Sequence, residues 1–211
     1  MRKLLFLALL LLGTSVSEAQ DIQLPQPDLS CRTTLMQALQ KRSSTRAFSD
    51  RDISNAQLST LLWAACGINR PAEGKITAPS AINAQDIMVI VVRKDGAYRY
   101  DPKANTLKQL STKDLRPAVA GRQTFAAKAP LALLMASDHK KFSKLPPAAA
   151  SRMGAIDCGY VSQNICLACA ALGLGTVPRA SMESDTLKKE LGLGDDVDLL
   201  MNNIVGWPEG K

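Results

Sequence analysis

Two runs of consecutive apolar residues predict buried β-strands. Residues 87–92 precede the polar turn 93–96, and residues 131–136 lie between a proline and a polar pair. A short apolar run bounded by turn-forming residues is typical of a strand that is covered on both faces. Residues 97–100 follow the polar turn as a second strand, so this part of the chain predicts a β-hairpin.

A helical period predicts two helices before these strands. Residues 33–42 place their apolar side chains on one face, with Thr33 or Thr34 as the cap. Ser54, with Gln57 three positions later, forms the capping box of a second helix, which ends at Gly67.

A long helix is predicted in the second half of the chain, opened by Pro146 and Pro147 and continuing to about Leu172. It is rich in Ala, Gly and Ser. Small side chains let helices approach closely, which suits a core helix of one subunit and a contact between two subunits equally. A shorter helix is predicted from Ser184 to about Leu191.

The order of elements favours an α+β fold. Residues 176–177 and 199–205 predict two late strands, whereas residues 107–123 are predicted to be irregular or helical. Strands separated in this way, without a repeating βα order, are typical of α+β proteins. We expect one domain over residues 33–211, preceded by an extended arm, residues 20–32, that packs on a partner subunit.

The amino terminus predicts export. Arg2 and Lys3 precede an apolar run, and the Ser17–Ala19 segment matches a small-x-small cleavage site. We therefore interpret residues 1–19 as a signal peptide and expect an exported protein, periplasmic or secreted, because the apolar run is too short for a membrane span.

Charge and cysteine content exclude several function classes. The net charge of +7 is spread along the chain without interleaved aromatic residues, which disfavours nucleic-acid binding. Cys166 and Cys169 have C-x-x-C spacing but lie in the middle of the long predicted helix, so we interpret them as core residues. The chain has a single histidine, His139, which disfavours hydrolase triads and histidine-rich metal sites; we expect it on the surface or in a loop.

Candidate chemistry lies in residues 41–48, KRSSTRAF. Two guanidiniums, Arg42 and Arg46, flank the hydroxyls of Ser43, Ser44 and Thr45. Arg grips phosphate as a planar fork, and neighbouring hydroxyls supply further donors. A solvated basic turn remains the alternative interpretation of this segment alone.

This stretch resembles the amino-terminal flavin motif of the nitroreductase family. Three later segments match that family in the same order: 58–68 (LSTLLWAACGI), 78–85 (APSAINAQ) and 157–176 (DCGYVSQNICLACAALGLGT). The resemblance implies an α+β fold with a central, mostly antiparallel sheet flanked by helices. It also implies FMN bound at the interface of a homodimer.

The resemblance also implies roles for individual residues. Arg42 and Ser44 would hold the FMN phosphate, with Ser43 adjacent, and Arg46 would approach the ribityl and pyrimidine side. A second set would contact the flavin partly from the other subunit: Pro79, Ser80 and Asn83.

The late strand and the carboxyl terminus complete the implied site. The region that approaches flavin N5 contains Pro178, Arg179 and Ala180, without the glycine that many members have there. Arg179 is either a second cation near the flavin or an exposed charge at a strand end. Lys211, the last residue, is a candidate phosphate contact. No catalytic residue is assigned, and no metal site is expected.

The function implied is that of an FMN-dependent oxidoreductase with ping-pong transfer from a small-molecule donor to a nitroaromatic, quinone or similar acceptor. Two alternatives remain open. The LLWAA and YRYDP segments also resemble the dehydrogenases that oxidise azolines in peptides. A secreted flavin-binding protein without catalytic activity is the other alternative.

Overall fold

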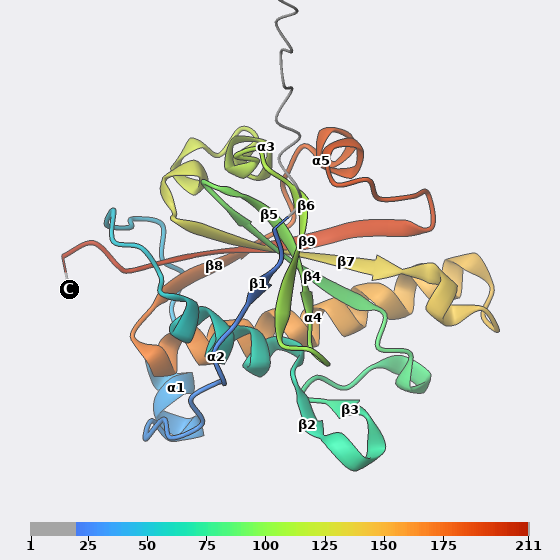
Figure 1. Cartoon of the computed structure of the whole chain (residues 1–211), viewed down its shortest axis with the longest axis horizontal. Coiled ribbons are helices and arrows are strands. Elements are labelled where there is room, and N and C mark those ends of the chain that lie inside the picture. The colour runs from blue at the N-terminus through green and yellow to red at the C-terminus, as the bar shows by residue number, and fades with distance from the viewer. Residues whose placement is uncertain (1–19, 211) are drawn as a thin grey trace, which may run out of the picture.

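The computed structural model describes residues 20–210, so the predicted signal peptide and Lys211 lie outside the described residues. A seven-stranded antiparallel sheet forms the centre (Figure 1). Its strands, in spatial order, are β1 (Ile22–Gln23), β6 (Thr106–Ser111), β5 (Gly96–Asp101), β4 (Ile87–Arg93), β7 (Leu131–Asp138), β9 (Val197–Gly206) and β8 (Gly175–Arg179). A separate small hairpin pairs β2 (Ile68–Arg70) with β3 (Lys75–Ile76).

Helices cover both faces of the sheet (Figure 1). One face carries α1 (Leu35–Lys41), α2 (Asn55–Cys66) and α4 (Pro147–Leu172), and the other carries α3 (Arg116–Ala120) and α5 (Ser184–Glu190). Four short 3-10 helices lie in the connections: η1 (Pro71–Glu73), η2 (Ala81–Asn83), η3 (Thr124–Lys128) and η4 (His139–Phe142). The predicted α+β architecture with a mostly antiparallel sheet is confirmed.

The central strands have continuous apolar sequences because their successive side chains enter two different cores, one on each face of the sheet. In β4, Val89 and Val91 belong to the core under α2 and α4, whereas Ile90 and Val92 belong to the core under α3 and α5. Successive side chains of a strand point to opposite faces. Because helices cover both faces, every position in the middle of β4 is apolar.

Capping residues fix the ends of the helices as the sequence predicts. Thr34 accepts a hydrogen bond from the amide of Gln37 at the start of α1, and Ser54 accepts one from the amide of Gln57 at the start of α2. The predicted long helix is α4, which ends where Gly173 takes a left-handed conformation with φ of 74°. Within residues 20–210, α4 is long and apolar enough to span a membrane by composition, but it packs on the sheet as a core helix does.

One prediction is corrected. Residues 107–111 are not irregular or helical but form β6, which pairs with β5 and has only Leu107 fully buried. A strand near the sheet edge needs fewer apolar residues, so its pattern is weak. The start of the predicted arm packs on its own chain: β1 pairs with β6, and Leu24 is buried in the core.

The cysteines and the histidine lie where the sequence placed them. All five cysteines are free; Cys166 and Cys169 are buried in α4, and burial raises the pKa of both thiols. His139 lies in η4, in the connection after β7, 3.0 Å from a carboxylate oxygen of Asp198.

Candidate functional site

Backbone contacts hold the segment 42–48 in a groove beside β8. The amide of Thr45 donates to the carbonyl of Thr176 (2.9 Å), and the amide of Glu209 donates to the carbonyl of Ala47 (3.2 Å). Gly175 permits this approach, because a Cβ there would lie 2.7 Å from Cγ2 of Thr45. The loop backbone is therefore fixed between β8 and the carboxyl-terminal segment.

The side chains of this loop remain free while its backbone is bound. Arg42, Ser43, Ser44 and Arg46 are all exposed, and none of the four side chains has a hydrogen bond or ion pair among the residues that the structure describes. A rigid backbone that presents two guanidiniums and two hydroxyls to solvent can bind an anion with little loss of conformational freedom.

A cavity of about 450 Å³ opens beside this loop. Lys41, Arg42 and Ser43 lie on its polar wall, and the end of α4 and β8 form the rest, including Cys166 and Thr176. Burial raises the pKa of Cys166, and the nearby positive charge of Arg42 opposes that shift. The volume lies in the range of small-molecule sites, and the polar wall suits an anionic group.

The second predicted group of contacts lies on a strained turn. Pro79 and Asn83 are exposed and Ser80 is partly buried, so the turn offers its residues to solvent. Ile82 and Asn83 have φ values of 50° and 57°, and Gln85 follows at 48°. Residues with a Cβ rarely adopt positive φ, so this conformation needs support from its surroundings.

The side chain of Asp157 supports this turn. In the sequence, Asp157 is only the first residue of the segment 157–176 that resembles the family. Oδ2 of Asp157 accepts a hydrogen bond from the amide of Ala81 (2.8 Å), and Oγ of Ser80 accepts one from the amide of Gln85 (2.9 Å). Asp157 lies in α4 and is buried, as is Asp86, which precedes β4. Burial beside Asp86 raises the pKa of Asp157 to about 6.

The loop and the turn lie at different places along α4. The turn contacts α4 at Asp157, whereas the cavity beside the loop reaches Cys166, nine positions later in the sequence. At 1.5 Å per residue, this separates them by roughly 13 Å along the helix axis. One chain therefore does not bring the two predicted groups of flavin contacts directly together.

Arg179 is buried within the protein and does not face solvent. Its side chain donates to Gln123 (2.7 Å), to Asn202 (2.9 Å) and to the carbonyls of Val119 (3.1 Å) and Ala120 (2.8 Å). These carbonyls lie at the end of α3, where a positive charge is favourable. Burial lowers the pKa of Arg179. The interpretation as an exposed charge is wrong, and the guanidinium is engaged within the protein.

The other late residues leave room for a backbone contact. Pro178 is partly buried in β8, opposite Asn203 of β9, and Ala180 is exposed just beyond the strand. Lys211 lies outside the described residues, but Glu209 places the end of the described chain beside the loop 42–48.

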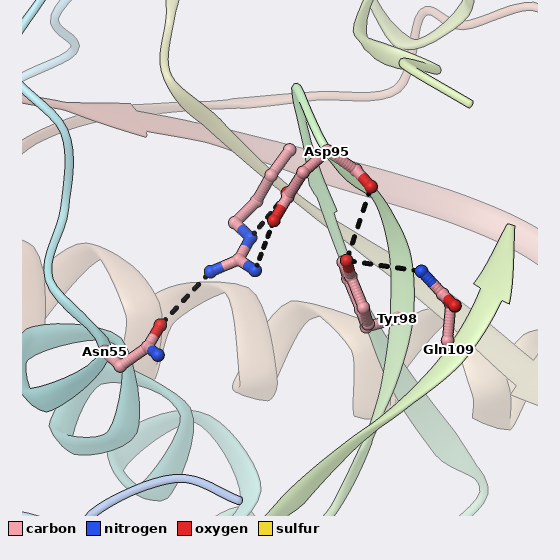
Figure 2. Close-up of polar contacts among 5 residues, drawn as sticks. Asn55, Asp95, Tyr98 and Gln109 are labelled. Atoms are coloured by element: carbon pink, nitrogen blue, oxygen red, sulfur yellow. Dashed lines mark hydrogen bonds and ion pairs between the residues drawn. The ribbon is translucent and has the colours of Figure 1, made fainter. Parts of the chain in front are cut away.

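A larger cavity lies elsewhere, and none of the predicted site residues lines it. It measures about 830 Å³ and is lined by charged residues that include Arg93, Asp95 and Arg116. Arg93 donates two bonds to Asp95 and one to Asn55 (Figure 2). Because Arg93 and Arg116 are each paired with a carboxylate, this cavity offers a ligand less positive charge than its arginines suggest.

Comparison with known proteins identifies the family. The Nitroreductase family profile matches residues 39–207. The nitroreductase-type protein MJ1384 of Methanocaldococcus jannaschii is 26% identical over 198 residues, which cover 88% of this chain and 96% of that protein.

Solved structures agree with this family. A nitroreductase-type protein of Ralstonia eutropha JMP134 is 35% identical, with a TM-score of 0.85 over 90% of each chain. The NADPH:FMN oxidoreductase of Vibrio harveyi, solved with NAD+, shares the fold at 20% identity, with a TM-score of 0.62 over 83% of this chain and 69% of that one. The chain belongs to the nitroreductase family.

Proposed function

We propose that the protein is an FMN-dependent oxidoreductase that passes electrons from a small-molecule donor to a nitroaromatic, quinone or similar acceptor. The observation that carries this proposal is the loop 42–48 of a nitroreductase fold, in which Arg42 and Ser43 line a cavity and the neighbouring Ser44 and Arg46 are exposed. Bound FMN would supply the redox chemistry, by accepting a hydride and releasing electrons to the acceptor.

The residues of this chain would bind and orient the cofactor. Arg42 and Ser44 hold the phosphate, with Ser43 adjacent, because a guanidinium and hydroxyls match its oxygens. Arg46 lies toward the pyrimidine side, where a cation stabilises the negative charge that develops on reduction. Asn83 can donate and accept, which suits the mixed polar edge of the ring.

A homodimer would complete the site. The loop and the turn of one chain lie apart along α4, so the turn of a second copy would supply Pro79, Ser80 and Asn83 to the loop of the first. Large apolar side chains remain exposed on the elements concerned: Leu35, Met36 and Leu39 of α1, Ile82 of the turn, and Ile156 and Tyr160 of α4. An exposed apolar surface of this kind favours burial against another copy.

One experiment tests the cofactor and the activity together. The purified protein is examined for a flavin absorption spectrum, and any flavin is identified after release. The bound flavin is then reduced anaerobically and mixed with a nitroaromatic or a quinone. We expect reoxidation faster than that of free FMN. Failure to bind added FMN would contradict the proposal.

The same measurement separates the two alternatives. Bound flavin that acceptors reoxidise no faster than free FMN would indicate a flavin-binding protein. Flavin reduction by an azoline-containing peptide, but not by small donors, would indicate a peptide dehydrogenase.

We propose that the protein is exported and that residues 1–19 are removed. The support is the charged, apolar and small-residue pattern of this segment. Nicotinamide cofactors are cytoplasmic, so an exported enzyme would use another donor in a ping-pong cycle. Amino-terminal sequencing of protein from its native host should begin at or near Gln20, and an intact Met1 on most of the soluble protein would contradict export.

A further inference from the structure

Two carboxyl groups are buried together beneath the turn 79–83. Asp157 of α4 is 2% exposed and Asp86 is 1% exposed. Among residues 20–210, no ion pair involves either of them. Oγ of Ser137 donates to Oδ2 of Asp86 (2.6 Å), and Gly154 makes room for this contact, because a Cβ there would collide with Ser137.

The hydrogen bonds of the pair leave one place for a proton. Oδ2 of Asp157 is occupied by the amide of Ala81, and Oδ2 of Asp86 by Ser137. Oδ1 of Asp86 is buried without a partner in the described part of the chain. Gly154, one helical turn before Asp157, packs against Asp86, because a Cβ there would lie 3.5 Å from Oδ2 of Asp86. This packing brings Asp157 and Asp86 to the same buried place, where a proton on Asp157 gives Asp86 the missing donor. Two carboxyls that share a buried site without a cation hold one proton between them.

The turn depends on this pair. Its backbone turns through positive φ at Ile82 and Asn83, and it is anchored to α4 by the bond from the amide of Ala81 to Asp157. When both carboxyls are ionised, their repulsion in the buried site moves Asp157 away from Asp86 and disturbs that anchor. The conformation of the turn is thereby linked to the protonation of the pair.

We propose that Asp86 and Asp157 are positioning residues that hold the turn 79–83, through one shared proton, in the conformation that binds flavin. The flavin half of this inference rests on the proposed function, and neither carboxyl touches the cofactor. The part of the ligand concerned is the flavin ring, which would contact Pro79, Ser80 and Asn83. Loss of the shared proton loosens the turn and weakens FMN binding.

The other titratable groups near the pair do not account for this dependence on pH. Burial raises the pKa of Cys158, its neighbour on α4, to about 12, so the thiol stays protonated. Asp138 at the end of β7 and Lys141 of η4 line the cavity that also reaches Asp86, together with Arg99 and Lys103. All four are present in every variant below. The turn itself, residues 79–83, contains no titratable side chain. His139 lies 3.0 Å from a carboxylate oxygen of Asp198 and is unchanged in every variant below.

Asp157→Asn is the informative variant. Its side-chain carbonyl still accepts from the amide of Ala81, and its NH₂ group donates to Asp86, so it imitates the protonated pair at every pH. Asp157→Ala removes the anchor. Asp196→Asn is the matched control, because Asp196 is an exposed carboxylate that pairs with Lys140 outside the pair.

FMN affinity is measured between pH 5 and pH 8 for all four proteins. The second ionisation of the FMN phosphate, near pH 6, is common to all of them and cancels in affinity ratios. We expect Asp157→Asn to bind FMN as tightly as the wild type at pH 5. At pH 8 it should bind FMN more tightly than the wild type, by about 5-fold or more. Asp157→Ala should bind roughly 10-fold more weakly at both values, and Asp196→Asn should follow the wild type.

Hydrogen exchange at the amide of Ala81 gives a second measurement that does not depend on FMN. In the wild type, protection of this amide should fall between pH 5 and 8 after correction for the intrinsic rate. Protection should stay constant in Asp157→Asn and be absent in Asp157→Ala. An equal pH dependence of FMN affinity in wild type and Asp157→Asn would overturn the inference, as would unchanged protection in Asp157→Ala. If the wild type binds no FMN, the proposed function and the flavin half of this inference both fail, and exchange alone then decides whether the pair holds the turn.

Discussion

The loop 42–48 and the turn 79–83 are the two predicted flavin-binding segments, and the protein fixes them in opposite ways. The loop is held by bonds between backbone groups, such as that from Thr45 to Thr176. The turn is anchored by a bond from the backbone amide of Ala81 to the buried side chain of Asp157. Its backbone also passes through positive φ, whereas no residue of the loop does so.

Because of this difference, the two segments should respond differently to pH. Backbone amides and carbonyls do not titrate between pH 5 and 8, so the backbone of the loop keeps its geometry across that range. Asp157 titrates within that range, because burial raises its pKa to about 6. In the proposed site, the loop would therefore contribute contacts that do not change with the protonation of the protein, and the turn would make binding of the ring adjustable.

The largest expected effect follows from separating the subunits. Gly159 lies on the exposed side of α4, and a Cβ there would meet no atom of the same chain within 4 Å. Gly159→Leu should therefore fold as a subunit but prevent a second copy from packing on α4. If the loop and the turn meet only across subunits, the variant loses both dimer and bound flavin in light scattering and absorption measurements.

Gly194→Leu is the matched control for this prediction. Gly194 is exposed, has open space around it and lies before β9, away from α4. It should remain dimeric with bound flavin. A monomeric Gly159→Leu with full flavin content would show that one chain suffices for the site.

The next effect concerns the phosphate grip of the loop. Arg42→Ala removes a charge-assisted contact worth about 1.5–3 kcal/mol, so FMN affinity should fall roughly 10- to 100-fold. The phosphate is equally charged in oxidised and reduced flavin, so the midpoint potential should change little. Arg122→Ala, which removes another exposed arginine, should leave both quantities unchanged in FMN titrations and dye-referenced potential measurements.

Arg46 is expected to act on the potential instead. A cation near the pyrimidine side favours the anionic reduced flavin, so Arg46→Ala should lower the midpoint potential by tens of millivolts. For a two-electron couple, about 30 mV corresponds to ~1.4 kcal/mol. If Arg46→Ala weakens binding as Arg42→Ala does and leaves the potential unchanged, Arg46 is a phosphate ligand. If neither variant matters, the loop is only a solvated basic turn.

The sequence predicts the loop better than the turn for a physical reason. The guanidiniums and hydroxyls of the loop are consecutive in the chain. They can therefore be recognised in the sequence as the motif KRSSTRAF. Asp86 and Asp157 are 71 positions apart, and only the packing of α4 against β4 and β7 brings them together. A pair that depends on tertiary packing leaves no local pattern.

For Arg179, the sequence suggested an exposed side chain as one interpretation, and the structure buries that side chain. At the end of a strand its charge suggests either solvent or a ligand. The hydrogen-bond partners that bury it come from α3, from Gln123 just before η3, and from β9. Helices and central strands were predictable because caps and apolar runs are local. The strand β6 was not, because its stability comes from pairing with β5 on one side and with the arm on the other.

The smallest expected effect is the pH dependence of stability. The pKa of Asp157 is about 6 in the folded protein, above its ordinary value of 3.8, so the folded state binds more protons than the unfolded state between these values. Its contribution to stability is therefore greatest below about pH 4 and is lost as the pH rises through 6. Asp157→Asn removes this titration, so its melting temperature relative to the wild type should rise between pH 4 and pH 7, by about 2–4 °C for each ~1 kcal/mol that the titration contributes in a domain of this size.

Asp114 provides a control of opposite sign. A hydrogen bond from Arg116 lowers the pKa of Asp114, so this group stabilises the fold above its ordinary pKa and the benefit is lost in acid. Asp114→Asn should therefore become less stable than the wild type as the pH rises from 3 to 6, whereas Asp157→Asn should become more stable than the wild type between pH 4 and 7. Thermal unfolding of the three proteins over this range measures both slopes. Parallel curves for Asp157→Asn and the wild type would mean that the pair carries no shared proton, and the turn would then be as insensitive to pH as the loop.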